Sequence, residues 1–89
     1  MKIAVLLPFK DTYTKDKAGS ASIWVKDFVK KSKYKNNISV YGHIKNLNRD
    51  ILINKKNYIN INYNFDYFIG SKNKKYVQVF NKLIEKKKI

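Results

Sequence analysis

The chain opens with an apolar run, Lys2 to Pro8, in which hydrophobic side chains do not alternate with polar ones. Such a run, rich in β-branched residues, is typical of a strand that is buried on both faces inside a parallel sheet. After the polar stretch Phe9 to Ala18, apolar residues recur at the spacing of one helical face, namely Ala21, Trp24, Val25, Phe28 and Val29. Residues 1–29 therefore predict a strand, a loop and a helix, the first half of a βαβ unit.

The middle of the chain predicts two further strands. Ile38 to Gly42 reads as a second strand, which a crossover through the preceding helix would set parallel to the first. The pattern from Ile44 to Asn57 is weak, so the usual crossover helix is expected to be missing or vestigial, and Asp50 to Ile53 forms either a turn of helix or an extended piece. Tyr58 to Tyr63 alternates in part and predicts a third strand near the sheet edge.

The last part predicts an aromatic turn and a helix. Phe65 to Ile69, ended by Gly70, is expected to pack against the sheet, and Ser71 is a good N-cap for a helix that reaches about Lys87. The buried face of this helix is predicted to comprise Tyr76, Val79, Phe80, Leu83 and Ile84. The predicted fold class is α/β, a partial Rossmann-like three-layer parallel sheet in the order strand, helix, strand, strand, helix, in one domain over residues 1–89.

The stretch between the first strand and the first helix holds the first candidate site residues. Phe9 to Ala18 exceeds the usual βα loop of roughly 2–6 residues, which indicates either a functional loop or a disordered surface excursion. Gly19 permits a close approach of the backbone to a ligand, and Ser20 and Ser22 suit the N-cap of the helix, a role that by itself explains both serines. In a βαβ unit the ligand lies near this helix N-terminus.

Composition narrows the class of protein. The hydrophobic content of 44% disfavours intrinsic disorder, and the absence of cysteine excludes disulfides and thiolate metal sites. A single histidine excludes a multi-histidine metal site within this chain. No stretch approaches the ~20 apolar residues of a membrane span, and the N-terminal apolar run is too short for a signal peptide, so a cytoplasmic protein is expected.

The formal net charge of +14 raises the question of a nucleic-acid partner. Nearly all of this charge is lysine, with Arg49 the only arginine, whereas bidentate recognition of bases and phosphates favours arginine. Lysine, asparagine and isoleucine all have A/T-rich codons, so a biased genome explains their abundance. We expect no specific nucleic-acid partner, and we expect the cationic surface to favour peripheral contact with an anionic membrane, at its inner face.

Four segments, taken in order, resemble the N-terminus of glycosyltransferase family 4: Lys2–Pro8, Ala18–Ser22, Ile38–Gly42 and Ser71–Val77. Members of this family have the GT-B architecture, two Rossmann-like domains that face each other across a cleft. The resemblance covers essentially the whole chain, but only about the first half of one of those domains. Many relatives carry Gly-Gly at the turn where this chain has Ala18-Gly19, so the family's role is carried over to Gly19 and its neighbour Ser20 alone.

The resemblance implies a transferase that moves a sugar from a nucleotide-sugar donor to a cell-envelope glycan or lipid-linked acceptor, without a cofactor or a metal. It implies that Gly19 and Ser20 approach the donor phosphates. It also implies that this domain holds the acceptor, for which Lys10, Asp11 and His43 are candidate loop residues.

The residues leave the general base open among Asp11, Asp16 and His43, because nothing in their spacing selects one. The family's fourth strand, acidic donor-site motif and nucleotide-sugar domain are not found in this sequence. Without a fourth strand, Ile3 to Leu7 would form an apolar sheet edge with unpaired backbone groups. We therefore expect these 89 residues to be a truncated or partial chain that is inactive on its own.

Two alternatives come from other classes. A small basic nucleic-acid-binding module would require the lysines to share an exposed face with the aromatic residues Tyr63, Phe65, Tyr67 and Phe68. A response-regulator-like domain would require acidic residues at the end of the first strand, where Phe9 and Lys10 stand instead.

Overall fold

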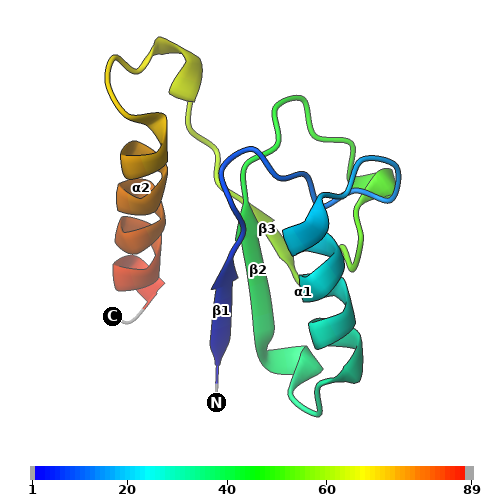
Figure 1. The fold of residues 1–89 in the computed structure, drawn as a ribbon. Coiled ribbons are helices and arrows are strands. Elements are labelled where there is room, and N and C mark those ends of the chain that lie inside the picture. The colour runs from blue at the N-terminus through cyan, green and yellow to red at the C-terminus, as the bar shows by residue number, and fades with distance from the viewer. Residues whose placement is uncertain (1, 88–89) are drawn as a thin grey trace.

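The computed structural model describes residues 2–87, apart from the side chains of Tyr67 and Lys87. Three parallel strands form one sheet in the spatial order β1-β2-β3 (Figure 1), and they are β1 (Ile3–Leu6), β2 (Ile38–Gly42) and β3 (Tyr58–Asn60). The prediction of an α/β fold with a three-stranded parallel sheet is confirmed.

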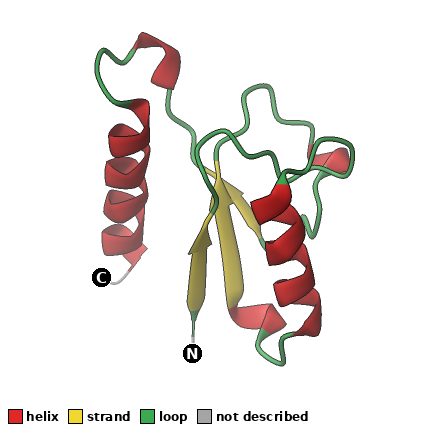
Figure 2. Ribbon diagram, in the orientation of Figure 1, coloured by secondary structure: helices red, strands yellow, loops and turns green. Residues whose placement is uncertain are grey.

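Two α-helices pack on opposite faces of the sheet. Helix α1 (Ser20–Lys31) follows β1 and covers one face, whereas α2 (Lys72–Lys87) follows β3 and lies on the other face beside β1 (Figure 1, Figure 2). The connection between β2 and β3 contains only a short 3-10 turn, Arg49–Ile51. The weak sequence pattern of that connection correctly predicts a vestigial crossover.

Strand β1 is an edge strand and is shorter than its sequence pattern predicts. It pairs with β2, with Ile3 opposite Ile38 and Leu6 opposite Tyr41, and no strand within residues 2–87 pairs with its other edge. Ala4 is exposed, and the other residues of β1 are only half-buried. The expectation that both faces of this strand are buried is therefore wrong, because the open edge leaves them accessible from the side.

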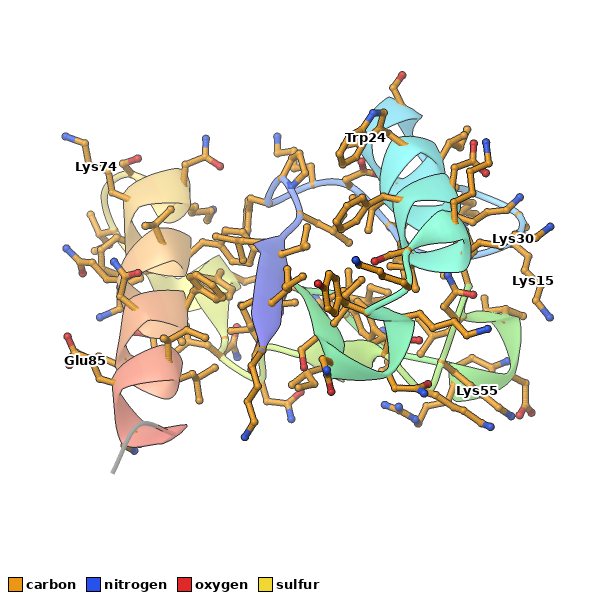
Figure 3. The ribbon with its side chains drawn as sticks, turned by 90° about the horizontal axis from the view of Figure 1, so that it is seen from below. Lys15, Trp24, Lys30, Lys55, Lys74 and Glu85 are labelled. Atoms are coloured by element: carbon orange, nitrogen blue, oxygen red, sulfur yellow. The ribbon has the colours of Figure 1, made fainter. Side chains whose placement is uncertain are left out.

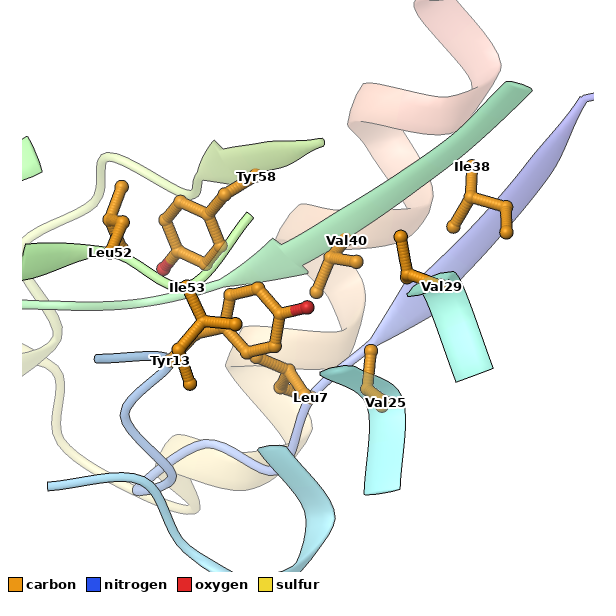
Figure 4. Packing of buried hydrophobic residues seen from close by; sticks show 9 residues of the cluster. All are labelled: Leu7, Tyr13, Val25, Val29, Ile38, Val40, Leu52, Ile53 and Tyr58. Atoms are coloured by element: carbon orange, nitrogen blue, oxygen red, sulfur yellow. The ribbon is translucent and has the colours of Figure 1, made fainter. Parts of the chain in front are cut away.

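The core on the α1 face draws on all three strands. Tyr13, from the loop after β1, stacks on Tyr58 of β3 with ring centroids 5.8 Å apart. The buried residues of this core (Figure 4) are Leu7, Tyr13, Val25, Val29, Ile38, Val40, Leu52, Ile53 and Tyr58. Removing this apolar surface from water is the main force that holds α1 on the sheet.

The core on the α2 face confirms the predicted face of the last helix. Its buried residues are Tyr41, Ile61, Phe65 and Tyr76, and Leu6, Phe9, Ile59, Val79, Phe80, Leu83 and Ile84 pack around them. The hydroxyl of Ser71 accepts a hydrogen bond from the amide of Lys74 at 3.3 Å, so the predicted N-cap of α2 is also confirmed.

Helix α1 is rotated relative to its predicted orientation. Its buried residues are Ser22, Val25 and Val29, whereas Trp24 is 65% exposed and stacks on Phe28. Successive helical residues are about 100° apart, so Trp24 points roughly 200° away from Ser22 once that small side chain faces the sheet. The prediction of Trp24 as a core residue is therefore wrong (Figure 3).

The loop between β1 and α1 is held against the segment that precedes β3. Thr14 forms an antiparallel bridge with Leu52, and the amide of Ile53 donates to the carbonyl oxygen of Tyr13 at 3.0 Å. Tyr13 itself is fully buried. The length of this loop therefore serves the core, which its polar sequence does not predict.

Alkaline conditions are expected to unfold the protein through its buried tyrosines. Burial raises the pKa values of Tyr13, Tyr58 and Tyr76 above the ordinary value of 10. Above that pH the folded state binds more protons than the unfolded state, so stability falls by up to about 1.4 kcal/mol per pH unit for each group. We expect the tyrosinate absorbance of these three residues to appear together with loss of the helical circular dichroism signal. Complete ionisation of the seven tyrosines in a still-helical protein would contradict this.

Candidate functional site

The loops that follow the strands meet at the carboxyl edge of the sheet, where ligands bind in open parallel sheets. Here the loop after β1 brings Asp11 to the N-terminus of α1. Its Oδ1 accepts a hydrogen bond from the Gly19 amide at 2.9 Å, and its Oδ2 accepts one from the Ser22 amide at 3.1 Å. Because the first amides of a helix have no partner inside it and favour negative charge, Asp11 caps α1.

Gly19 is the N-cap residue of α1, so the predicted capping roles of Ser20 and Ser22 are wrong. The backbone of Gly19 is extended, with φ −79°, a conformation open to any residue. What favours glycine here is space, since a Cβ would lie 2.5 Å from Oδ1 of Asp11 and that side chain would have to move. The group that lies close to Gly19 is thus a carboxylate of the same chain, and the expected approach of Gly19 to a ligand stays a prediction.

The remaining residues near this turn are exposed. Ser20 is the first residue of α1, and Lys10 lies beside a shallow hollow that reaches to the start of α2. Asp16 lines another hollow of about 810 Å³, whose charged lining also includes Lys15, Lys26 and Lys30. The structure therefore gathers Asp11, Gly19 and Ser20 and leaves Asp16 elsewhere.

His43 follows β2, and its ring is held on three sides. Its Nδ1 lies 2.8 Å from the carbonyl oxygen of Ile61. Phe9 stacks parallel to the imidazole with centroids 5.9 Å apart, and Phe65 meets it edge-on at 4.7 Å. Its neighbours therefore position His43, which is not a freely solvated loop residue.

A hollow of about 490 Å³ opens beside His43 at the carboxyl ends of β2 and β3. It is lined by His43, Ile44, Lys45, Asn60, Asn62, Tyr63, Asn64, Phe65 and Asp66. Lys45 and Asp66 form a hydrogen-bonded ion pair at its rim, and the Lys45 ammonium holds the pKa of the Asp66 carboxyl below its ordinary value. Both side chains are largely exposed, so water screens the pair and it adds little to stability.

The sequence-predicted residues thus occupy two places, the N-terminus of α1 and the hollow beside His43. Sequence reasoning missed Asn60 and Asn62, which belong to the second place. Their signal is the alternation of asparagine with isoleucine at Ile59 and Ile61, which sets two amides on one side of the chain as β3 ends.

The aromatic turn does not present the surface that base stacking requires. Phe65 is 2% exposed and packs edge-on against Phe9 and Tyr76. Tyr63 is partly exposed and carries the Lys75 ammonium 5.2 Å from its ring centroid, whereas Phe68 is half-buried. The condition set by the nucleic-acid alternative therefore fails at Phe65.

Comparison with protein-family models, curated proteins and solved structures yields no match. None of the helices in residues 2–87 is long and apolar enough to cross a membrane. The same part of the chain holds no group of three or more His, Cys, Asp or Glu side chains that could bind a metal ion.

Proposed function

We propose that this chain is the N-terminal part of a family 4 glycosyltransferase, which moves a sugar from a nucleotide-sugar donor to a cell-envelope glycan or lipid-linked acceptor. The four segments that resemble the family coincide with β1, the entry to α1, β2 and the start of α2. On this proposal the 89-residue chain belongs to the acceptor-side domain and is inactive by itself.

The observation that best supports the proposal is the position of α2. The chain continues from β3 to α2, which lies beside β1 on the face opposite α1 (Figure 1). There the Tyr76 hydroxyl donates to the carbonyl oxygen of Leu7 at 2.7 Å and anchors the helix. A chain that continued from α2 would reach the open edge of β1, as the fourth strand does in the Rossmann order 3-2-1-4. The proposed fold is accordingly a partial Rossmann-like domain, in which a fourth strand would make β1 an inner strand.

The proposed chemistry needs donors for the leaving diphosphate. The amides at Gly19 and Ser20, at the N-terminus of α1, suit such an anion. Because the Asp11 carboxylate already accepts the hydrogen bond of the Gly19 amide, binding of the sugar donor would require this carboxylate to move aside. Asp11 is therefore proposed as the group that the phosphate displaces, while Lys10 and His43 remain proposed acceptor-side residues.

The outer face of α1 supports peripheral contact with an anionic membrane. Ile23 and Trp24 are more than half exposed there, and Lys26, Lys30 and Lys31 are exposed on the same helix. Apolar and aromatic side chains beside lysines are typical of helices that lie at a membrane surface. We propose that this face rests on the cytoplasmic side of such a membrane.

The coding sequence beyond Ile89 tests the proposed function. We expect it to continue into an apolar strand and a second nucleotide-binding domain, and the longer product to transfer sugar from a nucleotide-sugar donor. A bulky residue at Gly19 of that product should weaken nucleoside-diphosphate binding. A stop codon directly after Ile89 would overturn the proposal.

A further inference from the structure

The hollow beside His43 has the size and place of a small-molecule site. Its volume of about 490 Å³ lies within the range of roughly 300–1,000 Å³ that such sites occupy. The proposed function uses His43 only as a candidate acceptor-side residue and gives the hollow no ligand of its own. The orientation of its polar groups identifies the chemistry of that ligand.

The backbone fixes which nitrogen of His43 carries the proton. A carbonyl oxygen can only accept, so the 2.8 Å contact with Ile61 requires a proton on Nδ1. With its single proton on Nδ1, the neutral form of the ring presents Nε2 as a hydrogen-bond acceptor, and no group that the structure describes hydrogen-bonds to it. Phe9 and Phe65 keep the ring in this orientation.

The backbone also fixes the polarity of Asn62, through Asn60. The amide of Ile44 donates to Asn60 Oδ1 at 2.8 Å, so Asn60 Nδ2 must find acceptors, and it donates to Asn62 Oδ1 at 2.9 Å. Asn62 therefore turns its oxygen toward Asn60 and keeps its Nδ2 donor for other partners. Asn60, which also accepts from the Tyr58 hydroxyl, is fully engaged and acts as the positioning residue.

The hollow thus offers a fixed acceptor and a fixed donor without a net charge. Among the described residues that line it, only Lys45 and Asp66 carry a formal charge, and they are paired with each other. A hydroxyl group both donates and accepts, so it matches this pair of groups. An anion has no proton to donate to Nε2, and the lone pair of that nitrogen would repel it. Tyr63 adds a partly exposed aromatic wall.

We infer that this hollow binds a neutral, hydroxyl-rich ligand of the glycoside class, with His43 Nε2 accepting from one hydroxyl and Asn62 Nδ2 donating to an oxygen of the ligand. That this ligand is the acceptor of a sugar transfer rests on the proposed function, but the binding itself needs no donor.

Nuclear magnetic resonance of the isotope-labelled 89-residue chain tests the inference. The imidazole nitrogen shifts should show His43 with its proton on Nδ1. Titration with a panel of methyl glycosides should shift the His43 ring and Asn62 side-chain signals together. His43→Ala and Asn62→Asp should each weaken binding about tenfold, the loss of one hydrogen bond. Asn81→Asp, the same change at an exposed position on α2, should leave binding unaltered.

Three results would overturn the inference: a proton on Nε2 instead of Nδ1, glycoside shifts that avoid both side chains, or a response to inorganic phosphate but to no glycoside. Any of them could occur while the coding sequence still encodes a glycosyltransferase. Conversely, glycoside binding could be present where the coding sequence ends at Ile89. The two proposals therefore fail separately.

Discussion

Tyr76→Ala is expected to cost about 3–5 kcal/mol in free energy of unfolding, as large aromatic truncations in cores do. The side chain is 2% exposed, and its ring packs against Phe9 and Phe65 with centroids 5.2 and 5.9 Å away. Its hydroxyl also holds α2 to the end of β1 through Leu7. At roughly 0.05–0.15 kcal/mol per residue, the whole chain has only about 4–13 kcal/mol to lose, so this variant should lose about a quarter or more of its stability.

Two further variants separate the causes of that loss, with urea unfolding followed by circular dichroism as the measurement. Tyr76→Phe keeps the ring and removes the hydrogen bond, so it should cost about 1–3 kcal/mol by leaving the Leu7 carbonyl unsatisfied. Val77→Ala, at the next and exposed position of α2, should change stability by less than about 0.5 kcal/mol. Equal effects at positions 76 and 77 would show that α2 is not anchored as described.

The contrast between the two helices shows how far periodicity predicts packing. In α2 the buried face is aromatic and aliphatic, so the spacing that begins at Tyr76 identified it correctly. In α1 the most completely buried residue is the small, polar Ser22, which a search for large apolar residues does not find, and Trp24, predicted to be buried, is 65% exposed. Periodicity finds the apolar residues of a helix, but it does not predict that a small polar residue such as Ser22 is buried.

The loop after β1 shows that sequence patterns do not predict contacts between residues far apart in the chain. Tyr13 lies in a stretch without periodicity, and it is a core residue whose backbone pairs with Ile53, far along the chain. The candidate site behaves in the same way. Sequence placed Gly19 and Ser20 at a helix N-terminus, but the capping group is Asp11, which the bridge between Thr12 and Ala18 brings back to the helix. Sequence rules for helix caps consider the residues next to the start of the helix, so they do not identify Asp11 as the cap.

Asp11→Ala should lower the free energy of unfolding by about 1–3 kcal/mol, because the amides of Gly19 and Ser22 lose their partner. Gly19→Ala should cost a similar amount by forcing the carboxylate out. The double variant should be scarcely worse than either single one, a coupling within the range of roughly 0.5–3 kcal/mol for residues in contact. Asp16→Ala, at an exposed position of the same loop, is the matched control.

Added phosphate can show whether Asp11 is only a structural cap or whether its carboxylate occupies a site that would otherwise bind an anion. Asp11→Ala exposes helix amides that suit phosphate, so added phosphate should raise the unfolding midpoint of this variant by RT ln(1 + [L]/Kd). The native protein and Asp16→Ala should gain only the general stabilisation that phosphate gives to any protein, which sets the baseline at equal ionic strength. An equal gain in all three proteins would mean that the turn has no affinity for phosphate. A gain confined to Asp11→Ala would mean that Asp11 holds the place of an anion.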